Sequence, residues 1–483
     1  MNDQHNPEPE IKKWIAPSFI LSGICWYLSC GLNGDSWFLL WLAPVPVLVV
    51  ALNLSGKKAF AISFLGYLIG RMSWFTYLIT VATIIPAILF TLLLPLIFAL
   101  IVTGTRWIVV KTKFWIGIFP FPVFFTAYEF LLLSFSADGT AGSISYSQAN
   151  FLPVIQIASI TGILGITFVV TLIPSILAVG WYHHKEKNQF RMALILATAI
   201  AFLVCLYGAL RISSKPEKKS IKAGLVVLEE NHHFVTDQPV LKDELNTAAI
   251  YTDSISGLAE KGAELVLLPE RAFNVSAETE SGIMQMLEST ARKNHVYIVT
   301  GYTNFKNKPL RNSALVIDTT GHIICDYDKV HLVTGFESQF TPGYETGLFA
   351  MEGLQAGTAI CKDLDFPVHL RQYGMKNTQI VFVPAWDFVQ DDWLHSRMAI
   401  MRGVENGFSE VRSARQGRLT ISDCFGRVNS EASSVPKNDV TLLGEVTILK
   451  KDTFYSRFGD WFGILNLVSS IVLIIVGSSR RSR

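Results

Sequence analysis

The sequence has little charge for its length. Asp, Glu, Lys and Arg make up only 17% of its 483 residues, whereas a soluble domain has about 25%. Half of the residues are hydrophobic, and the mean hydropathy is +0.36. This composition argues against an ordinary soluble protein and places the chain among membrane proteins.

Several kinds of site are absent from the sequence. Its six cysteines have no zinc-like spacing, and no Gly-rich phosphate loop is present, so we expect no metal and no cofactor. No basic patch interleaved with aromatic residues occurs, so we expect no nucleic-acid partner. Cys325, Cys361 and Cys424 lie in the more polar part of the chain, and this odd number predicts at least one free thiol.

Long apolar runs dominate the rest of the sequence. A helix needs about 20 predominantly apolar residues to cross a bilayer. We therefore predict about eight transmembrane helices, at residues 15–32, 36–54, 59–79, 84–110, 114–135, 153–181, 190–212 and 459–478. No cleavage site of small residues follows the first run, so we expect it to be retained and not removed as a signal peptide.

The distribution of Lys and Arg among the short loops predicts the orientation in the membrane. Basic residues fall in alternate loops, which predicts cytoplasmic termini and an extracytoplasmic region between the last two spans. Lys215, Lys218 and Lys219 run against this pattern, but a large domain translocates largely regardless of charge. The basic residues that carry the pattern are Lys57, Lys58, Lys111, Lys113, Lys185, Lys187, Arg191, Arg480, Arg481 and Arg483.

Residues 220–450 form a more polar region, which separates a seven-span domain at 1–213 from a C-terminal span and tail at 456–483. In this region short β-rich runs alternate with stretches of helical spacing, which indicates an α/β domain. Residues 311–332 are typical of two strands joined by a Thr-Thr-Gly turn. Other expected strands are 222–228, 264–269, 296–301, 313–318, 357–361, 379–384 and 442–448, and the expected helices are 240–262, 277–294 and 390–408.

Three reactive side chains follow predicted strands. Glu270 ends the run ELVLLPE, Lys329 lies in YDKVHL, and Cys361 lies in TAICKDLDF. A Cys thiolate is a nucleophile, a Glu carboxylate can take its proton, and a Lys ammonium can stabilise an oxyanion. Singly, each is more often a core cysteine, a helix cap or a solvated partner of an acid such as Asp328. Their shared placement favours a catalytic set that forms a thioester, resolved by water or an amine.

These motifs resemble those of the nitrilase, or carbon–nitrogen hydrolase, superfamily. The match spans roughly 220–450 and rests on LLPE with Glu270, DKVHL with Lys329 and AIC with Cys361. The resemblance implies an α-β-β-α sandwich with a Glu–Lys–Cys triad. The segment GFESQFTPG is similar to the family's stretch after the lysine, which implies that Glu337 is a second glutamate that positions the triad. Without the resemblance, Glu337 would be interpreted as an ordinary loop carboxylate.

Eight spans with a nitrilase-like domain before the last one resemble the apolipoprotein N-acyltransferase family. The stretch SYSQANFLPVIQIASITGILGITF, residues 145–168, is similar to that family's stretch before and within its sixth span. The resemblance covers nearly the whole chain and implies a bacterial cytoplasmic (inner) membrane enzyme with a periplasmic catalytic domain. It also implies a phospholipid acyl donor and a diacylglyceryl-cysteine lipoprotein whose N-terminal amine accepts the acyl chain.

The chain departs from this family's pattern beside the nucleophile. Lys362 and Asp363 follow Cys361, where the acyltransferases usually carry Tyr-Glu. Lys362 either lowers the pKa of the thiol or points to the opposite face, as successive strand residues do. Later in the chain, VPAWDF stands where the family has an Asn-Asp-Ala-Trp-Phe-like run, and Arg415 stands where an Asn is expected.

Three further residues are candidates for substrate binding. Arg71 lies within the third predicted span, and a charge inside a membrane segment is a functional candidate by default. It either meets a phospholipid headgroup or reaches the interface through its long stem. Trp386 and His395 align with the family's helix region, and each is as readily structural as substrate-binding.

Three hypotheses for function follow. The first is acyl transfer from a phospholipid, through a Cys361 thioester, to the lipoprotein amine. The second keeps the nucleophile in a membrane-tethered amidase, or in an acyltransferase with a different amine acceptor, as the residues after Cys361 suggest. The third is a non-catalytic scaffold, which the presence of Glu270, Lys329 and Cys361 together disfavours.

Overall fold

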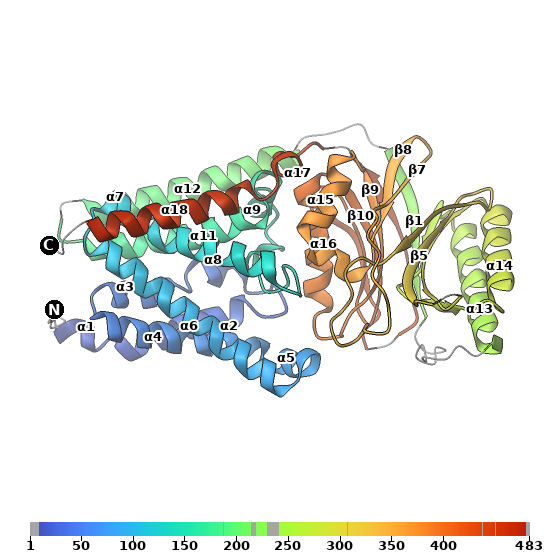
Figure 1. The fold of residues 1–483 in the computed structure, drawn as a ribbon. Coiled ribbons are helices and arrows are strands. Elements are labelled where there is room, and N and C mark those ends of the chain that lie inside the picture. Colours follow the sequence, from blue (N-terminus) through green and yellow to red (C-terminus); the bar gives the residue numbers. More distant parts are fainter. Residues whose placement is uncertain are drawn as a thin grey trace. The chain divides into compact units, whose positions relative to one another are not determined.

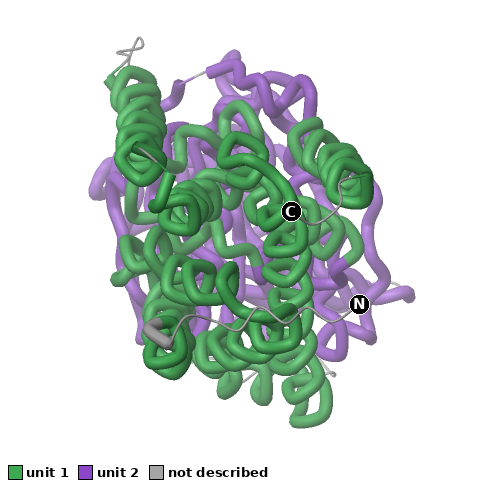
Figure 2. The backbone as a smooth tube through the Cα atoms, turned by 90° about the vertical axis from the view of Figure 1, so that its left-hand side faces the viewer, with its two compact units in different colours: residues 1–135, 143–213, 460–483 green, residues 136–142, 214–459 purple. Residues whose placement is uncertain are grey.

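The chain packs into two compact units (Figure 2). Unit 1 contains residues 1–135, 143–213 and 460–483, and unit 2 contains residues 136–142 and 214–459. The computed structural model describes residues 9–186, 188–213, 219–228, 241–306, 308–436, 438–449 and 451–479. Of the basic residues considered for the orientation, Lys187, Lys215, Lys218, Arg480, Arg481 and Arg483 lie outside the described residues.

The described secondary structure of unit 1 is helical (Figure 1). Helix α11 is almost entirely buried and packs against α3, α8 and α12. The longer helices are α2 (Ile15–Ser29), α4 (Gly56–Arg71), α6 (Ile84–Val109), α8 (Pro120–Phe135), α11 (Ile163–Tyr182), α12 (Gln189–Ser213) and α18 (Trp461–Ser479). The shorter ones are α1 (Pro9–Lys12), η1 (Trp37–Trp41), α3 (Val45–Leu52), η2 (Met72–Trp74), α5 (Phe75–Ala82), α7 (Phe114–Gly117), η3 (Ile144–Gln148), α9 (Leu152–Ile155) and α10 (Ala158–Thr161).

Five helical segments are long and apolar enough to cross a membrane. They are Ile84–Val109, Phe114–Phe135, Ile163–Tyr182, Gln189–Ser213 and Trp461–Ser479. The outer helices among them, α6, α12 and α18, expose many leucine and isoleucine side chains. A soluble protein rarely exposes apolar surface on this scale, whereas lipid-facing helices do so.

The expected number of eight spans is not confirmed. The first three expected spans, 15–32, 36–54 and 59–79, correspond to helices that are shorter or interrupted. The second is divided between η1 and α3 beside Pro44, which has no backbone donor. The third ends its first helix at Arg71 and continues through η2 into α5. Apolar composition predicts burial in lipid but does not predict such breaks.

Unit 2 has four layers, in which two sheets lie between two pairs of helices (Figure 1). This is the α-β-β-α arrangement that the nitrilase resemblance implies. The first sheet has the order β13-β1-β2-β4-β5-β6, with β3 paired to β4, and the second has the order β12-β11-β10-β9-β8-β7. Helices α13 (Leu241–Glu260) and α14 (Glu280–Asn294) cover the first sheet, and α15 (Pro367–Met375) and α16 (Asp392–Asn406) cover the second.

The strands of the first sheet are β1 (Lys219–Val227), β2 (Leu265–Leu267), β3 (Phe273–Val275), β4 (Tyr297–Asn304), β5 (Arg311–Ile317), β6 (Ile323–Asp328) and β13 (Val440–Ile448). Those of the second are β7 (Gly347–Met351), β8 (Leu354–Thr358), β9 (Ile380–Trp386), β10 (Ser409–Arg415), β11 (Arg418–Ser422) and β12 (Val428–Ser433). Two short helices, η4 (Cys361–Asp365) and α17 (Phe454–Phe458), complete the unit.

The alternation of side chains along the strands builds three apolar cores. On β1, Ile221, Ala223 and Leu225 point between the sheets, whereas Val226 faces the helices α13 and α14. Strands β1, β2 and β4 run parallel in one sheet, and β8, β9 and β10 run parallel in the other. Parallel pairing brings the carboxyl ends of neighbouring strands to one edge, so the residues that follow them gather there.

The expected strands and helices of unit 2 each overlap an observed element. Strand β10 was not expected, because Glu410, Arg412 and Ser413 give it a polar sequence although every residue in it is buried. Strand β12 is polar and partly exposed, and β3 has only three residues. These strands are therefore held by pairing with their neighbours and not by apolar periodicity.

The hydroxyl of Tyr373 joins helix α15 to strands β7 and β8. It donates a hydrogen bond to Thr358 O at 2.8 Å and accepts one from Gly347 N at 3.0 Å. We expect Tyr373→Phe to lower the free energy of unfolding by about 1–3 kcal/mol, because both backbone groups lose a buried partner. Thermal unfolding of the purified full chain measures the change. Tyr344→Phe, at a position that is 86% exposed, is the control, and equal losses in the two variants would contradict the prediction.

Candidate active site

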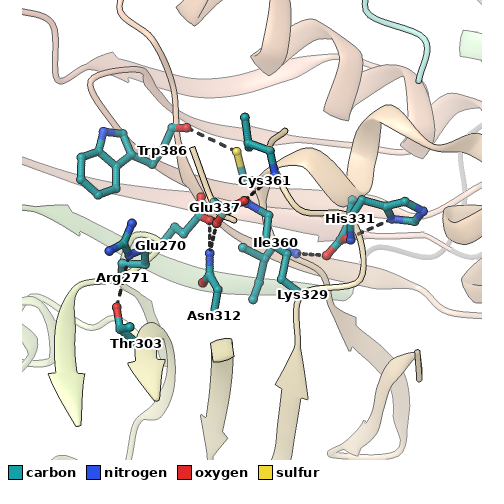
Figure 3. Close-up of polar contacts among 12 residues, drawn as sticks. Glu270, Arg271, Thr303, Asn312, Lys329, His331, Glu337, Ile360, Cys361 and Trp386 are labelled. Carbon is teal, nitrogen blue, oxygen red and sulfur yellow. Dashed lines mark hydrogen bonds and ion pairs between the residues drawn. The ribbon is translucent and has the colours of Figure 1, made fainter. Parts of the chain in front are cut away.

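A buried ammonium lies between two buried carboxylates at the edge of the sandwich (Figure 3). Lys329 Nζ donates to Glu270 Oε1 at 2.7 Å and to Glu337 Oε2 at 2.9 Å. Asn312 Nδ2 completes the cluster by donating to Oε1 of both carboxylates, at 2.6 Å each. All three charged residues are 5% exposed or less. Such a group is stable only because each charge has charged and hydrogen-bonded partners.

Backbone contacts fix the positions of these side chains. Glu270 follows β2, and a Cβ at the neighbouring Gly301 of β4 would come within 2.6 Å of its Cα. A glycine is therefore required at that position. Lys329 follows β6, and its backbone N donates to Asn312 O at 2.8 Å. Glu337 Oε2 accepts a further bond from Val333 N at 2.7 Å.

The candidate nucleophile, Cys361, begins η4, which is separated from β8 by two residues. Its φ of 44° lies in the left-handed region, which non-glycine residues rarely occupy. The residue is 8% exposed, and its thiol donates to Trp386 O at 3.4 Å (Figure 3). A left-handed residue between a strand and a helix places the thiol on a sharp turn of the chain, which fixes its direction.

Asp363 ties the turn of the nucleophile to the segment that carries the lysine. Its Oδ2 accepts from Ile360 N at 3.0 Å, and its Oδ1 accepts from Val330 N at 3.1 Å and from His331 N at 2.8 Å. The Tyr327 hydroxyl also donates to it, at 2.7 Å. Burial raises the pKa of Asp363, but a hydrogen bond with the His331 side chain, electrostatic attraction to neighbouring histidines and the bond from Ile360 N bring this pKa below its usual value. A fully buried carboxylate thus fixes residues on both sides of the site.

The electrostatics favour a neutral thiol in the resting site. Burial raises the pKa of the Cys361 thiol well above its ordinary value, and Glu270 adds to this while Lys329 opposes it. Burial also raises the pKa of Glu270, although Lys329 counteracts the shift. Burial alone would lower the pKa of Lys329, but Glu270 and Glu337 raise it well above its usual range. A thiol, a carboxylate and a permanent ammonium are the components of base-assisted nucleophilic attack.

The structure joins Glu270, Lys329 and Glu337 in one cluster, and Cys361 lies close enough to interact electrostatically with Glu270 and Lys329. Their role as a catalytic set stays a prediction. Lys362 directs its ammonium to Asp138 of the 136–142 segment, at 2.7 Å. Thr140 of the same segment donates through N and Oγ1 to Asp365 O, both at 2.9 Å. A segment between two helices of unit 1 in the sequence thus packs on the turn of the nucleophile.

His395 and Trp386 also lie near the site. His395 is within 3.5 Å of both Asp387 and Asp391, and these acids raise its pKa to about 10 despite burial. Asp387 in turn binds Arg412 at 2.6 Å. Trp386 contributes the carbonyl that accepts from the thiol. Arg71 belongs to unit 1 and is not part of this cluster.

Two arginines surround the Trp386 ring. The guanidinium carbon of Arg415 lies 4.5 Å from the ring centroid, and that of Arg271 lies 5.6 Å from it. Arg415 Nη1 also donates to Arg271 O at 3.3 Å. Arg415 entered the sequence comparison only as a departure from a family motif, and Arg271 was not considered.

Sequence reasoning missed two residues that hold the site. Asn312 is the second residue of β5, and a single amide near the start of an apolar strand carries no distinctive signal. Asp363 was noted only because it replaces a glutamate. Its position two residues after the nucleophile was the available clue.

Comparison with known proteins gives matches over most of the chain. Residues 22–176 match the apolipoprotein N-acyltransferase N-terminal domain, and residues 237–437 match the carbon–nitrogen hydrolase family. Apolipoprotein N-acyltransferase of Geobacter metallireducens is 24% identical over 96% of this chain and 95% of its own length. Over nearly its whole length the chain is similar to an apolipoprotein N-acyltransferase, and its N-terminal part matches the domain model of that family. The relatives are bacterial proteins, and the apolar helices of unit 1 agree with the membrane character of this family.

Further matches cover less of the chain. Apolipoprotein N-acyltransferase of Thermotoga maritima is 24% identical over 74% of this chain and 71% of its own length. The 2-oxoglutaramate amidase of Bacillus subtilis is 29% identical over 35% of this chain and 74% of its own length. Among solved structures, an amidase from Nesterenkonia sp. covers 48% of this chain and 91% of its own, with 21% identity and a TM-score of 0.41.

The charge of Glu337 generates a prediction about pH dependence. The Glu337 carboxylate raises the pKa of Glu270, so Glu337→Gln should lower that pKa. A base acts only when it is unprotonated, and activity therefore falls as the pH falls through the pKa of Glu270. We expect the acidic limb of Cys361 acylation to move down by about one pH unit. The rate of single-turnover acylation of Cys361 by a chromogenic ester, measured as a function of pH, gives the position of this acidic limb.

Glu280→Gln is the matched control. Glu280 pairs with Lys306 at 2.8 Å and is half-exposed, so its loss should leave the limb unchanged. An acidic limb of Glu337→Gln that stays in place or moves to higher pH would exclude the assigned coupling.

Proposed function

We propose that this chain transfers a fatty acyl group from a phospholipid, through a thioester on Cys361, to the N-terminal amine of a diacylglyceryl-cysteine lipoprotein. The observation that carries the proposal is the Cys361 thiol beside the Glu270–Lys329 pair, in a chain whose other unit presents apolar, membrane-length helices. The relative from Geobacter metallireducens, which matches nearly the whole chain, bears the name of this activity.

The first half-reaction forms the thioester. Glu270 takes the proton of the Cys361 thiol as its sulfur attacks the ester carbonyl carbon of the phospholipid. The carbonyl oxygen becomes negative, and the ammonium of Lys329 stabilises it. The carbon–oxygen bond of the ester then breaks, and Glu270 returns the proton to the departing lysophospholipid hydroxyl.

The second half-reaction transfers the acyl chain to nitrogen. The neutral α-amine of the lipoprotein attacks the thioester carbon, and Glu270 removes a proton from this nitrogen. Lys329 again stabilises the oxyanion. The carbon–sulfur bond breaks, an amide is formed, and the Cys361 sulfur regains its proton from Glu270.

The other predicted residues have supporting roles in this proposal. Glu337 orients Lys329, with which it pairs at 2.9 Å. Lys362 holds the turn of the nucleophile through Asp138. Trp386 and His395 line the route of a substrate next to Cys361.

We further propose the membrane arrangement that the sequence implies. Residues 1–213 form a seven-span domain, 220–450 form the catalytic domain and 456–483 form the last span, which gives eight spans in all. The catalytic domain faces the periplasm, as the alternate basic loops indicate. Both lipid substrates present their reacting groups at the surface of the bilayer, where such a domain can reach them.

A second candidate function keeps the thioester but changes the acceptor. The chain is similar to an amidase over about a third of its length, and Lys362 and Asp363 replace the Tyr-Glu usual in the acyltransferases. A membrane-tethered amidase, or an acyltransferase with another amine acceptor, would use the same three residues. It would release free acid or modify a different amine.

Intact-mass analysis tests the function. The purified full chain is incubated with phospholipid and a model diacylated lipoprotein. We expect a gain of one fatty-acyl mass on the N-terminal amine of the lipoprotein, and we expect Cys361→Ala to abolish it because the nucleophile is removed. The matched control is Cys325→Ala, a free thiol of unit 2 outside the site.

The other outcomes separate the candidates. An acyl adduct on Cys361 without lipoprotein modification would favour the second candidate. Full transfer by Cys361→Ala would overturn the thioester mechanism and revive a different nucleophile or a scaffold.

Labelling of introduced cysteines tests the orientation. Tyr344 of unit 2 is 86% exposed, and Lys57 is an exposed residue in a predicted cytoplasmic loop. In cells with a permeabilised outer membrane, an impermeant maleimide should label Tyr344→Cys at least about tenfold more than the parent chain, because the inner membrane excludes the reagent from the cytoplasm only. Lys57→Cys should react only after lysis. The reverse pattern would invert the proposed topology.

A further inference from the structure

Arg71 of unit 1 is a buried cation in a helical unit of apolar, membrane-length helices. It is the last residue of α4, where the chain breaks into the short helix η2. The side chain is 7% exposed, and its Nε is buried without a hydrogen-bond partner. Within the described part of the chain, no carboxylate forms an ion pair with it. A charge in this condition is costly unless another group completes its coordination.

The contacts of Arg71 compensate the charge only in part. The ring of Trp74 lies 4.9 Å from the guanidinium carbon, and the end of α4 provides a partial negative charge. Neither supplies the in-plane acceptors that a guanidinium fork requires. The indole nitrogen of Trp74 donates to Cys30 O at 2.5 Å, which fixes the ring in this position.

The buried acid of the same unit is committed elsewhere. Glu129 is 2% exposed and accepts hydrogen bonds from Ile144 N, at 2.8 Å, and from the Thr167 hydroxyl. The hydroxyl groups of Tyr67 and Tyr128 and the thiol of Cys30 lie close enough to Arg71 to interact with it electrostatically. The protein thus surrounds a fixed cation with polar groups but does not neutralise it.

We propose that Arg71 and Trp74 form a binding site for a phosphate group, carried by a phospholipid headgroup at the surface of unit 1. A guanidinium presents its donors in a fork that matches phosphate oxygens bidentately. Helix α5, which follows directly, is apolar and has no buried residue, so it offers a surface for acyl chains beside the phosphate. The inference deepens the proposed function, because it assigns a place for the donor lipid outside the catalytic cluster.

A thermal titration of the full-length protein tests the site. The unfolding midpoint of the purified chain in neutral detergent is followed against a short-chain phosphatidylglycerol, a matched diacylglycerol and inorganic phosphate. For the native chain we expect saturable stabilisation by the phospholipid and little by the diacylglycerol. Stabilisation by inorganic phosphate to the same extent would support the phosphate site and identify a free anion as its ligand.

Substitutions of Arg71 give the decisive comparison. Arg71→Met should raise the unfolding midpoint in the absence of lipid, because it removes a buried charge. It should also lower the affinity for the phospholipid at least about tenfold. Arg71→Lys keeps the charge but loses the fork, so its affinity should be intermediate. Arg106→Met is the matched control. Arg106 is 7% exposed in α6 and donates through Nε to Leu54 O, so its loss should lower the midpoint but leave the affinity unchanged.

Two results would overturn the inference. One is native affinity for phosphatidylglycerol in both Arg71 variants, and the other is equal stabilisation of the native chain by diacylglycerol. Acylation of Cys361 by a soluble ester without phosphate is measured alongside. If the native chain shows no acylation of Cys361, the proposed function is wrong. The lipid titration can still be interpreted in that case.

Discussion

The site depends on one ammonium between two carboxylates. Lys329 is buried with Glu270 and Glu337, and removal of its ammonium would leave two buried carboxylates without a charged partner. Three features of the surrounding fold hold the cluster in place. Asn312 donates hydrogen bonds to both carboxylates, Gly301 leaves room for Glu270, and Val333 N donates to Glu337. The cluster requires the strand ends to meet closely, and the sandwich allows this.

A second buried carboxylate extends the constraint to the nucleophile. Asp363 binds backbone groups before the cysteine and after the lysine, so a shift in one segment moves the other. The turn is also held by the 136–142 segment, through Asp138 and Thr140. A reactive thiol thus has its distance from base and ammonium set before any substrate arrives. Electrostatic stabilisation is most effective when it needs no such rearrangement during the reaction.

Much of this architecture follows from local sequence. The positions of Glu270, Lys329 and Cys361 just after strands could be predicted, because the pattern of residues reveals the strands. Contacts between distant residues leave no local mark: Lys362 and Asp138 are 224 positions apart. Polar but buried strands such as β10 are not predicted from sequence for a related reason. Pairing with neighbouring strands stabilises them, and their own side chains give no apolar pattern. Hydropathy identified the apolar runs of unit 1. Because it is averaged over many residues, it does not reveal where a helix is interrupted, as α4 is at Arg71.

The left-handed backbone of Cys361 links reactivity to stability. A side chain in that region raises the energy of the folded state by about 1–3 kcal/mol, whereas glycine adopts it freely. A glycine at this position would relieve the backbone strain but would remove the thiol, and the hydrogen bonds around Asp363 offset part of the cost of that strain. At this position a residue that increases the stability of the folded protein would remove the thiol. Substitutions meant to stabilise the protein are therefore best made at other positions.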